Sequence, residues 1–235
     1  MIFLRFLFGL IVGSFLNVLI YRIPRDQPFV AGRSHCPHCN HILAWYDLIP
    51  VASFLMLRGR CRYCGHTISP QYPIIEIISA IFFVFAPSAP ALIVLELFLI
   101  LAIIDYQHFI IPDGLLIALV IVSPFMGAIS WNHVLAVLGC GGFFFALWAI
   151  SKGRWIGFGD VKFAAVLGLL FGFPGAVVVI YIAVILGGLF GVILLVLHKA
   201  TGKTPLPFGT LLGLCAIAFI FLEKPIMKAL AFWNF

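Results

Sequence analysis

Long apolar stretches separated by short polar breaks follow one another along almost the whole chain. This pattern predicts eight helices, at residues 2–20, 72–87, 90–105, 114–130, 132–150, 160–173, 175–198 and 207–222. The breaks fall at turn-forming clusters, at residues 86–90, 173–175 and 199–207. Apolar runs of about 18–20 residues match the ~30 Å hydrocarbon core of a bilayer. The predicted fold is therefore an all-α polytopic membrane protein with about eight transmembrane helices.

The composition supports this prediction. Of the 235 residues, 64% are hydrophobic and only 9% are charged, and the mean hydropathy is +1.21. A soluble domain of this length could not hide so much apolar surface. The first apolar run, 1–20, is long, and no small-residue cleavage site follows it. We therefore expect an anchoring first helix there rather than a signal peptide.

Four Gly-x-x-x-Gly patterns lie within the predicted spans. They are Gly9 with Gly13, Gly168 with Gly172, Gly187 with Gly191 and Gly209 with Gly213. Small residues at this spacing let helix backbones approach closely in lipid, so we expect them to mark helix contacts.

The net charge of +6 raises the question of a nucleic-acid partner. In membrane proteins, however, basic residues gather in the cytoplasmic loops. If the N-terminus lies outside the cytoplasm, only Arg5, Lys224 and Lys228 remain outside. The other 11 of the 14 basic residues lie inside, namely Arg22, Arg25, Arg33, Arg58, Arg60, Arg62, Lys152, Arg154, Lys162, Lys199 and Lys203. We predict this orientation, contact with membrane lipid and no nucleic-acid partner.

Residues 22–71 form the one sizeable polar segment. It contains two Cys-x-x-Cys pairs separated by 21 residues, Cys36 with Cys39 and Cys61 with Cys64. Two such pairs suit a tetrahedral zinc ion. The alternative is two disulfides, which a reducing cytoplasm disfavours. Because about fifty residues are too few for a good apolar core, we predict a structural zinc ion that stabilises the segment.

The predicted organisation has three parts. A first transmembrane helix, 1–21, leads into a cytoplasmic zinc-binding segment, 22–71, and a transmembrane domain follows at 72–235. Four thiolates complete a closed zinc site, so we expect the neighbouring histidines to lie around it or at the surface; they are His35, His38, His41 and His66. Cys140 and Cys215 lie within apolar spans, where we expect them to pack as small hydrophobic residues.

Five of the eight acidic residues have a structural explanation. Asp26 and Asp47 lie in the polar segment and are expected to be solvated or turn-forming. Glu223 is expected at the outer end of the last helix. We expect Glu76 to pair with a nearby arginine. Glu96 lies inside a span, as a buried hydrogen-bonding group or as part of a functional path.

The other three acids lie at predicted helix ends. Asp113 follows a proline at the start of a helix and is expected to be its N-cap. Asp105 ends a helix, where the helix dipole disfavours negative charge. Asp160 begins a helix and follows Gly157 and Gly159, whose missing side chains let another backbone approach closely. Asp105 and Asp160 are therefore the candidates for chemistry.

The predicted topology places Asp105 and Asp160 at one depth, near the cytoplasmic face. Two carboxylates in a partly desolvated site share a proton, so one can activate water while the other polarises a scissile carbonyl. The spacing alone fits an ion-coupling pair in a transporter equally well, although a transporter would place its acids near the midplane beside broken helices. A third alternative is a non-enzymatic scaffold that recruits a secretion ATPase through the zinc segment.

Several sequence motifs, taken in order along the chain, favour the aspartyl-protease hypothesis over the other two. They are GSFLNVLIYRIP at 13–24, the two cysteine pairs, DLIPVASFLMLRGRCRYCG at 47–65, ISPQYPIIE at 68–76, IDYQHFIIPD at 104–113 and GFGDVKFAAVLGLLFG at 157–172. Over most of its length the chain thereby resembles the type IV prepilin peptidases, bacterial membrane aspartyl proteases of the GxGD type. The combination is specific, whereas any one motif would be weak.

The resemblance implies roles for individual residues. Asp105 and Asp160 match the two catalytic aspartates of the family, and Asp113 matches a frequent acid without a catalytic role. Lys162 matches the lysine of the family's G-D-x-K segment, and pairing with an aspartate or with a lipid phosphate would both fit. The expected substrate-binding residues are Gly157, Gly159 and Lys162, with the glycines lying against the extended leader of the substrate.

The resemblance also implies a function and a location. The 72–235 domain would be an aspartic endopeptidase in the bacterial inner membrane, which cleaves prepilins and pseudopilins after a leader glycine at the cytoplasmic face. Family members that keep the cysteine segment often methylate the new N-terminal amine with S-adenosylmethionine, so both activities are expected. A peptidase without methyl transfer is the alternative. The sequence shows no nucleotide-binding motif, so the cofactor-binding residues stay unknown; the zinc segment and the region of Gly59 are the expected place.

Overall fold

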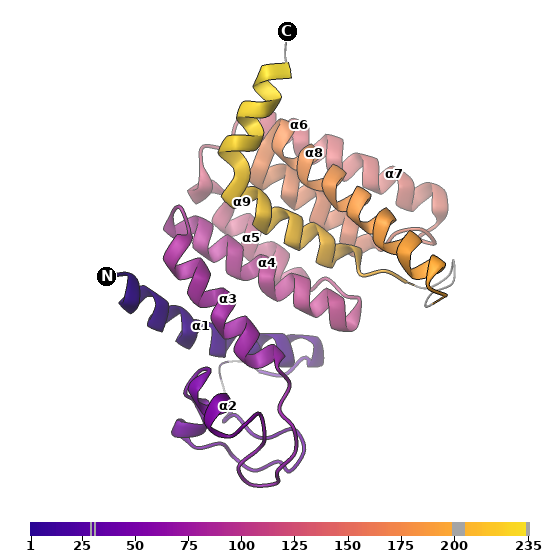
Figure 1. Ribbon diagram of the computed structural model, residues 1–235. Coiled ribbons are helices and arrows are strands. Elements are labelled where there is room, and N and C mark those ends of the chain that lie inside the picture. Colours follow the sequence, from indigo (N-terminus) through magenta and orange to yellow (C-terminus); the bar gives the residue numbers. More distant parts are fainter. Residues whose placement is uncertain (29, 31, 199–204, 234–235) are drawn as a thin grey trace. The chain divides into compact units, whose positions relative to one another are not determined.

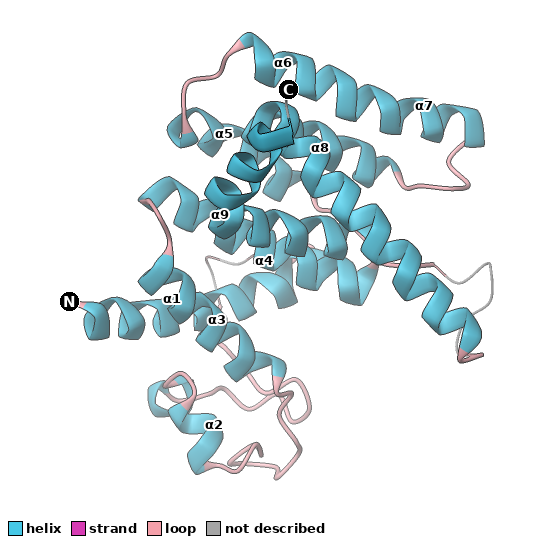
Figure 2. Cartoon of the chain, turned by 45° about the horizontal axis from the view of Figure 1, so that its top comes forward, coloured by secondary structure: helices cyan, strands magenta, loops and turns pink. Residues whose placement is uncertain are grey.

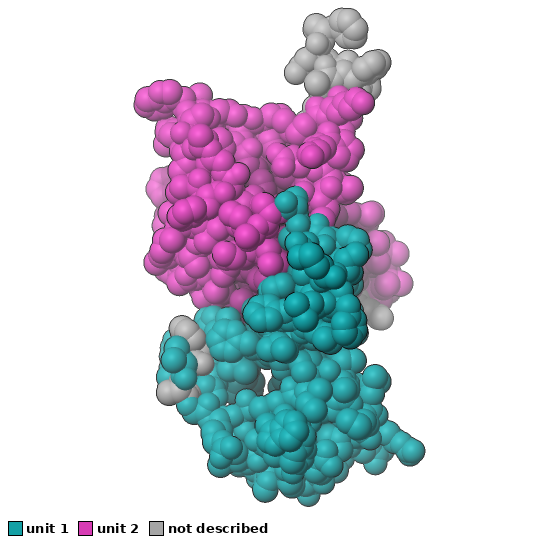
Figure 3. All heavy atoms as spheres, turned by 90° about the vertical axis from the view of Figure 1, so that its left-hand side faces the viewer, with its two compact units in different colours: residues 1–87 teal, residues 88–235 magenta. Residues whose placement is uncertain are grey.

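The chain folds into two compact, largely helical units. The computed structural model describes residues 1–28, 30, 32–198 and 205–233. The first unit is Met1–Pro87 and the second is Ser88–Phe235 (Figure 3). The predicted break at 199–207 and the predicted inside cations Lys199 and Lys203 lie wholly or mostly outside the described residues. The division into 1–21, 22–71 and 72–235 follows composition rather than packing, and it stays a prediction.

Unit 1 consists of two long helices and the cysteine segment between them. The helices are α1 (Ile2–Arg22) and α3 (Gln71–Phe85), which pack against each other. Between them lie the short 3-10 turns η1 (Ile23–Arg25) and η2 (Trp45–Leu48) and the short helix α2 (Ala52–Met56). Figure 1 shows this segment as a loop-rich body beyond the ends of α1 and α3.

The contact between α1 and α3 is made backbone against backbone. A Cβ atom on Gly9 would lie 2.5 Å from Ala80 Cα, and one on Gly13 would lie 2.6 Å from Glu76 Cα. Ser79 adds a hydrogen bond from its Oγ to the carbonyl of Gly9, 3.0 Å long. The first Gly-x-x-x-Gly pattern is therefore a helix-packing motif, as predicted.

Unit 2 contains the remaining helices, arranged around α8 (Figure 2). They are α4 (Ala89–His108), α5 (Asp113–Met126), α6 (Trp131–Ala136), the π-helical turn η3 (Val137–Gly141), α7 (Gly142–Ser151), α8 (Phe158–Val196) and α9 (Phe208–Trp233). α8 contacts α5, α6, α7 and α9, and α4 contacts α5 and α9. The N-terminal ends of α5, α8 and α9 can therefore approach the C-terminal end of α4.

α8 has two arms. Gly172 has a φ of 57° and Phe173 has a ψ of 142°, so neither residue is helical, and Pro174 follows them. Asn132 donates a 2.7 Å hydrogen bond to the carbonyl of Phe173 and thereby contacts the break directly. The arms correspond to the predicted helices 160–173 and 175–198.

The last helix is longer than predicted. The sequence places its end at residue 222, with Glu223 at that end, whereas α9 continues to Trp233 with Pro225 inside it. Glu223 is exposed within this helix rather than at its end. A proline in the interior of a helix removes one backbone donor, so Pro225 favours a helix that ends before it. In the structure, α9 nevertheless continues through this proline.

The described residues include five helices that are long and apolar enough to cross a membrane. They span Ile2–Arg25, Ala89–His108, Trp131–Ser151, Phe158–Val196 and Phe208–Ala229. Gln71–Phe85 and Asp113–Met126 are apolar but shorter. All eight predicted segments are thus helical, and the chain is a multi-pass, all-helical membrane protein with a four-cysteine cluster between α1 and α3.

Candidate active site and metal centre

Four helix ends meet at one end of unit 2. Asp105 lies in the last turn of α4, and Asp113 is the first residue of α5. Asp160 lies in the first turn of α8, and Thr210 lies in the first turn of α9. Three of these ends are helix N-termini, whose free N–H groups favour negative charge. The fold therefore gathers acids where backbone donors are available.

Asp105 is held by the first turn of α9. Its carboxylate is buried, with the residue 5% exposed. Oδ2 accepts a 2.6 Å hydrogen bond from the backbone N–H of Thr210, and the Thr210 hydroxyl lies 3.0 Å away from the same oxygen. An acid at the C-terminal end of its own helix is thus stabilised by the N-terminal end of another helix.

Asp160 is held by its own helix. Its Oδ2 accepts a 3.2 Å hydrogen bond from the backbone N–H of Gly157, the residue before α8 begins. The carboxylate thereby satisfies one of the orphan donors at this N-terminus. Gly159 packs closely against Ile111, because a Cβ atom there would lie 3.2 Å from Ile111 Cβ. Gly157 is exposed, and its nearest neighbour is the Asp160 carboxylate.

Asp105 and Asp160 lie in one neighbourhood. The charge on Asp105 is close enough to act electrostatically on Asp160. Ile111 joins the two positions, because it lies against Gly159 on one side and against Gly209, which adjoins the Asp105 carboxylate, on the other. The described hydrogen bonds of both acids go to Oδ2, so each has an Oδ1 that can act on a water molecule or a carbonyl group.

Asp113 has a different role from the predicted one. It is the first residue of α5 rather than the N-cap, and its side chain makes no capping hydrogen bond. Its carboxylate instead forms a salt bridge with Lys162 across the gap between α5 and α8. Both side chains are partly exposed. Of the two partners that would fit Lys162, an aspartate or a lipid phosphate, the structure shows an aspartate, and it is neither of the two candidate catalytic acids.

Thr210 and Gly209 were not recognised as site residues from the sequence. A Cβ atom on Gly209 would lie 3.0 Å from Asp105 Cγ and 2.9 Å from Ile111 Cδ1, so only glycine lets α9 approach this closely. Thr210 supplies both donors to Asp105. The Pro-Phe-Gly-Thr run at 207–210 is typical of a helix start. A helix start alone, however, does not indicate which distant side chain its free N–H groups will bind.

The cysteine segment brings its four thiols together. The Sγ atoms of Cys36, Cys39, Cys61 and Cys64 all lie within 4.8 Å of one another, and those of Cys36 and Cys64 are 4.0 Å apart. Four thiolates about 2.3 Å from a zinc ion would lie about 3.8 Å apart, so the cluster fits tetrahedral zinc. The cysteines are free, which argues against the disulfide alternative.

The two cysteine pairs are built alike. The N–H of Cys36 donates to the carbonyl of His41, and the N–H of Cys61 donates to the carbonyl of His66. The residue after each second cysteine has a positive φ, 56° at Asn40 and 70° at Gly65, and these residue types tolerate that conformation. Each pair is therefore a tight knuckle set by local sequence, so the spacing predicts the geometry well.

Local donors prepare the first thiol for a metal ion. Burial by itself would raise the pKa of the Cys36 thiol, but the backbone N–H groups of Cys39 and His38 and the neighbouring thiols lower this pKa to about 7. A metal ion binds the thiolate rather than the thiol. The described cluster of ligand atoms consists of the four thiols, and the exposed rings of His38 and His66 stack on each other with centroids 3.9 Å apart.

Asp47 links its own turn, η2, to the second knuckle, and the expectation of a turn-forming residue is confirmed. Its side chain is only 3% exposed. It accepts hydrogen bonds from Arg62 Nε at 2.8 Å, from the Tyr63 hydroxyl at 2.9 Å and from the Ala44 N–H at 3.2 Å. Desolvation would raise the pKa of Asp47, but these hydrogen bonds and the Arg62 charge lower it below its usual value. A charged residue in a small segment was therefore buried because donors from three positions surround it.

Glu76 also departs from its expected role. It is buried in α3, and its Oε2 accepts a 2.7 Å hydrogen bond from the backbone N–H of Val51 rather than forming an ion pair with an arginine. Val51 has a φ of 60°, which is rare for a β-branched residue. Glu76 therefore holds a strained turn of the cysteine segment against α3.

Comparison with known families agrees with the division into two units. Residues 7–89 match the family described as the bacterial Peptidase A24 N-terminal domain, and residues 92–192 match the type IV leader peptidase family. The first match ends and the second begins close to the boundary at Pro87 and Ser88. No solved structure matches the chain.

Several curated proteins are similar over most of the chain, and each carries the name prepilin leader peptidase/N-methyltransferase. The protein from Bacillus subtilis is 33% identical, with 89% of each chain covered. The protein from Klebsiella pneumoniae is 38% identical over 71% of this chain and 83% of its own. The protein from Myxococcus xanthus is 36% identical over 84% of this chain, which spans 63% of that longer relative.

Proposed function

The chain belongs to the type IV leader peptidase family, Peptidase A24, and from this premise we propose that Asp105 and Asp160 form the catalytic dyad of a prepilin leader peptidase. One observation carries the proposal. Two carboxylates from α4 and α8 lie in one neighbourhood, each with one oxygen fixed by a backbone N–H and the other oxygen available. Preorganised acids of this kind can supply the general base and the general acid for hydrolysis of a peptide bond.

The proposed mechanism uses the pair as a unit. One carboxylate takes a proton from water while the protonated partner donates a hydrogen bond to the scissile carbonyl oxygen. The water oxygen attacks the carbonyl carbon, and the leaving amine then receives the proton that the first aspartate took up. Because the acids share a proton, the pair titrates jointly, and the cleavage rate is expected to have a bell-shaped pH dependence.

The same premise suggests the arrangement in the membrane. Eight crossings result if the two arms of α8 and the shorter helices α3 and α5 also span the bilayer. Within unit 2, the basic residues Lys152, Arg154 and Lys162 lie before or within the start of α8, at the end that holds Asp160. By the positive-inside rule, these cations support a dyad at the cytoplasmic face of a bacterial inner membrane.

The names of the relatives support a prepilin substrate and methylation of an amine. We propose that the chain cleaves prepilins and pseudopilins after the leader glycine, and that it N-methylates the new terminus with S-adenosylmethionine as methyl donor. Exposed Gly157 is the place where an extended leader can approach the dyad, and Gly159 keeps Ile111 in position beside it. Zinc held by the four cysteines would have a structural role, since four protein ligands leave no open position.

The transporter alternative is less well supported. It requires acids beside a helix break near the midplane. The break in α8 lies at Gly172 and Phe173, which is about 18 Å along the helix from Asp160 at 1.5 Å per residue. The acids lie at helix ends instead, where an approaching peptide can meet them.

The test uses the purified full chain in detergent and a synthetic prepilin N-terminal segment with a basic leader that ends in glycine. Asp105→Asn and Asp160→Asn are each expected to reduce cleavage, followed by mass spectrometry, by at least about 1,000-fold. Asp113→Asn is the matched control, because Asp113 lies at the same helix ends, and it should cleave within about threefold of the wild type. If both dyad variants still cut the peptide, the assignment is wrong.

A further inference from the structure

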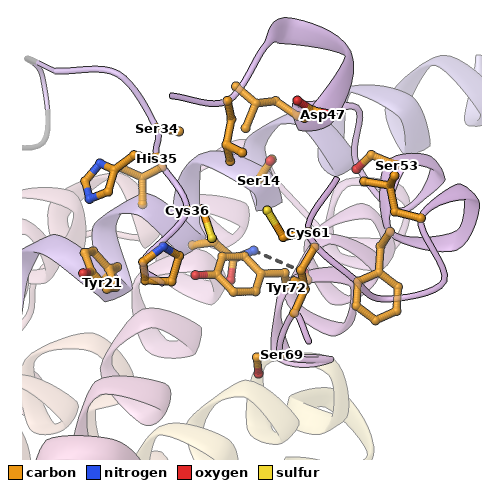
Figure 4. A pocket seen from close by; sticks show the side chains of 18 of the residues that line it. Ser14, Tyr21, Ser34, His35, Cys36, Asp47, Ser53, Cys61, Ser69 and Tyr72 are labelled. Carbon is orange, nitrogen blue, oxygen red and sulfur yellow. Dashed lines mark hydrogen bonds between the residues drawn. The ribbon is translucent and has the colours of Figure 1, made fainter. Parts of the chain in front are cut away.

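Unit 1 contains a cavity of about 660 Å³ between the helix pair α1–α3 and the cysteine segment. Ser14, Asn17, Tyr72 and Glu76 line it from the two helices. The cysteine segment supplies the opposite wall, which includes His35, Cys36, Asp47, Ser53 and Cys61 (Figure 4). The volume is within the range of small-molecule sites, about 300–1,000 Å³. The proposed peptidase mechanism uses none of these residues, so the cavity is distinct from the aspartate site.

Asn17 offers a hydrogen-bond acceptor that the protein does not use. The residue is 4% exposed and lines the cavity. Its Nδ2 donates to the carbonyls of Gly13 and Tyr72, both at 3.2 Å. Its Oδ1 has no hydrogen-bond partner among the described residues. Because a buried acceptor without a donor costs free energy, this oxygen indicates a ligand that carries N–H or O–H groups.

Glu76 places a carboxylate on the facing helix. It lines the same cavity, and the hydrogen bond from the Val51 N–H fixes its Oε2. The absence of a side chain at Gly13 brings α1 against the Cα of Glu76, one turn from Asn17. An acidic group and a free acceptor are therefore held close together by a rigid backbone contact. A ligand with a positively charged N–H group, such as an amine, fits this pair.

The rest of the lining suits a large, partly aromatic ligand. Phe15, Tyr21, Phe54 and Tyr72 contribute rings to it. Such rings can stack on a heterocyclic base, and their faces attract a cationic centre. The cavity thus combines an amine site with space for a second, ring-containing molecule.

We propose that this cavity is the methyl-transfer site, where S-adenosylmethionine binds against the aromatic wall and the new N-terminal amine binds between Asn17 and Glu76. The inference rests on the N-methyltransferase part of the proposed function, and it assigns residues to it. Asn17 Oδ1 accepts one N–H of the amine and thereby orients its lone pair toward the donor. Glu76 attracts the ammonium form and removes its proton.

The chemistry balances with these two groups. The terminal ammonium gives one proton to the Glu76 carboxylate and becomes a neutral amine. The amine nitrogen then attacks the methyl carbon, the new N–C bond forms as the C–S bond breaks, and the electron pair of that bond goes to sulfur. The products are a secondary ammonium group and neutral S-adenosylhomocysteine. The carboxylate near the sulfonium also favours binding of the charged donor over the neutral product.

The experiment separates this site from the peptidase. The acceptor is a synthetic peptide that already begins at the new N-terminus, so methylation does not depend on cleavage. With methyl-tritiated S-adenosylmethionine, Glu76→Gln keeps an oxygen for the Val51 N–H and is expected to lower peptide methylation at least about 100-fold. Asn17→Ala is expected to lower it about tenfold. Both variants should cleave an uncut prepilin segment within about threefold of the wild type.

Ser79→Ala is the matched control, because Ser79 also makes a buried hydrogen bond from α3 to α1 but does not line the cavity. It should retain methylation. In a second measurement, ultraviolet cross-linking of the tritiated donor to the wild-type chain should label peptides from residues 14–76. Label in unit 2, or methylation by Glu76→Gln and Asn17→Ala equal to that of Ser79→Ala, would overturn the inference alone. A wild-type chain that cleaves but neither methylates the peptide nor binds the donor would overturn the methyltransferase function as well.

Discussion

The polar sites of the two units are built in different ways. In unit 2, Asp105 and Asp160 are fixed by backbone N–H groups at the first turns of α9 and α8. In unit 1, Asn17 and Glu76 lie on two helices in direct contact, and the cysteine segment closes the space above them. Helix ends carry their own donors, whereas a segment of this kind depends on a metal ion for its shape. The two activities should therefore fail under different conditions.

Zinc removal is expected to separate the two sites most strongly. A chelator should lower methylation of the pre-cleaved peptide at least about 100-fold, because the wall of the cavity loses its structure when the metal leaves. Cleavage should fall less than about tenfold, since the hydrogen bonds described for the two aspartates come from residues of unit 2. Both rates are measured on one sample before and after zinc is restored. Equal loss of the two activities would contradict the separation.

Removal of the Thr210 hydroxyl, which supports Asp105, should have the next largest effect, a lower rate of cleavage. Thr210→Val removes the hydroxyl donor, keeps the shape and retains the backbone N–H, so cleavage should fall about tenfold. Thr210→Ser should restore most of the rate, because it restores the donor. Methylation of the pre-cleaved peptide should not change. A valine variant with the wild-type cleavage rate would show that the hydroxyl does not position Asp105.

Asp47 tests how the cysteine segment is held together. Asp47→Asn should speed the transfer of zinc to a competing chelator about fivefold at pH 7, because the charge-assisted bond to Arg62 is lost. The pKa of Asp47 is lowered below 3.8, so its carboxylate stabilises the fold above about pH 4, and this contribution is lost as the pH falls through the lowered pKa. The ratio of the two rates should therefore stay constant between pH 8 and 5. A ratio that declines steadily over this range would contradict the assignment.

The smallest effect on leader cleavage is expected from substitutions that break the salt bridge between Asp113 and Lys162. Their side chains are 65% and 36% exposed, and such pairs contribute about 0–1 kcal/mol. Asp113→Asn and Lys162→Met should each change kcat/KM for leader cleavage less than about threefold. A loss above tenfold for Lys162→Met alone would show instead that Lys162 contacts the substrate, as the family resemblance implies.

The sequence determined those features that depend on local order. Hydrophobic runs fix the helices, because each span must satisfy its own backbone in lipid. The Cys-x-x-Cys spacing fixes the two knuckles, since their hydrogen bonds join residues within five positions. The order of the motifs fixes the family, and the two aspartates stand out because so few acids occur in the chain.

The tertiary structure decided what each polar group contacts. Asp105 finds its donors 105 residues away at Thr210, and Asp113 pairs with Lys162 rather than with its own helix end. Glu76 binds the N–H of Val51, and Asp47 is buried among Arg62, Tyr63 and Ala44. A sequence pattern reports which face of a helix is apolar, but a hydrogen bond depends on distances of a few ångströms between segments that only the packed fold brings together. For the same reason the sequence did not predict the unpaired acceptor of Asn17. Its Oδ1 lacks a hydrogen-bond partner only because α1 and α3 pack around it in the fold.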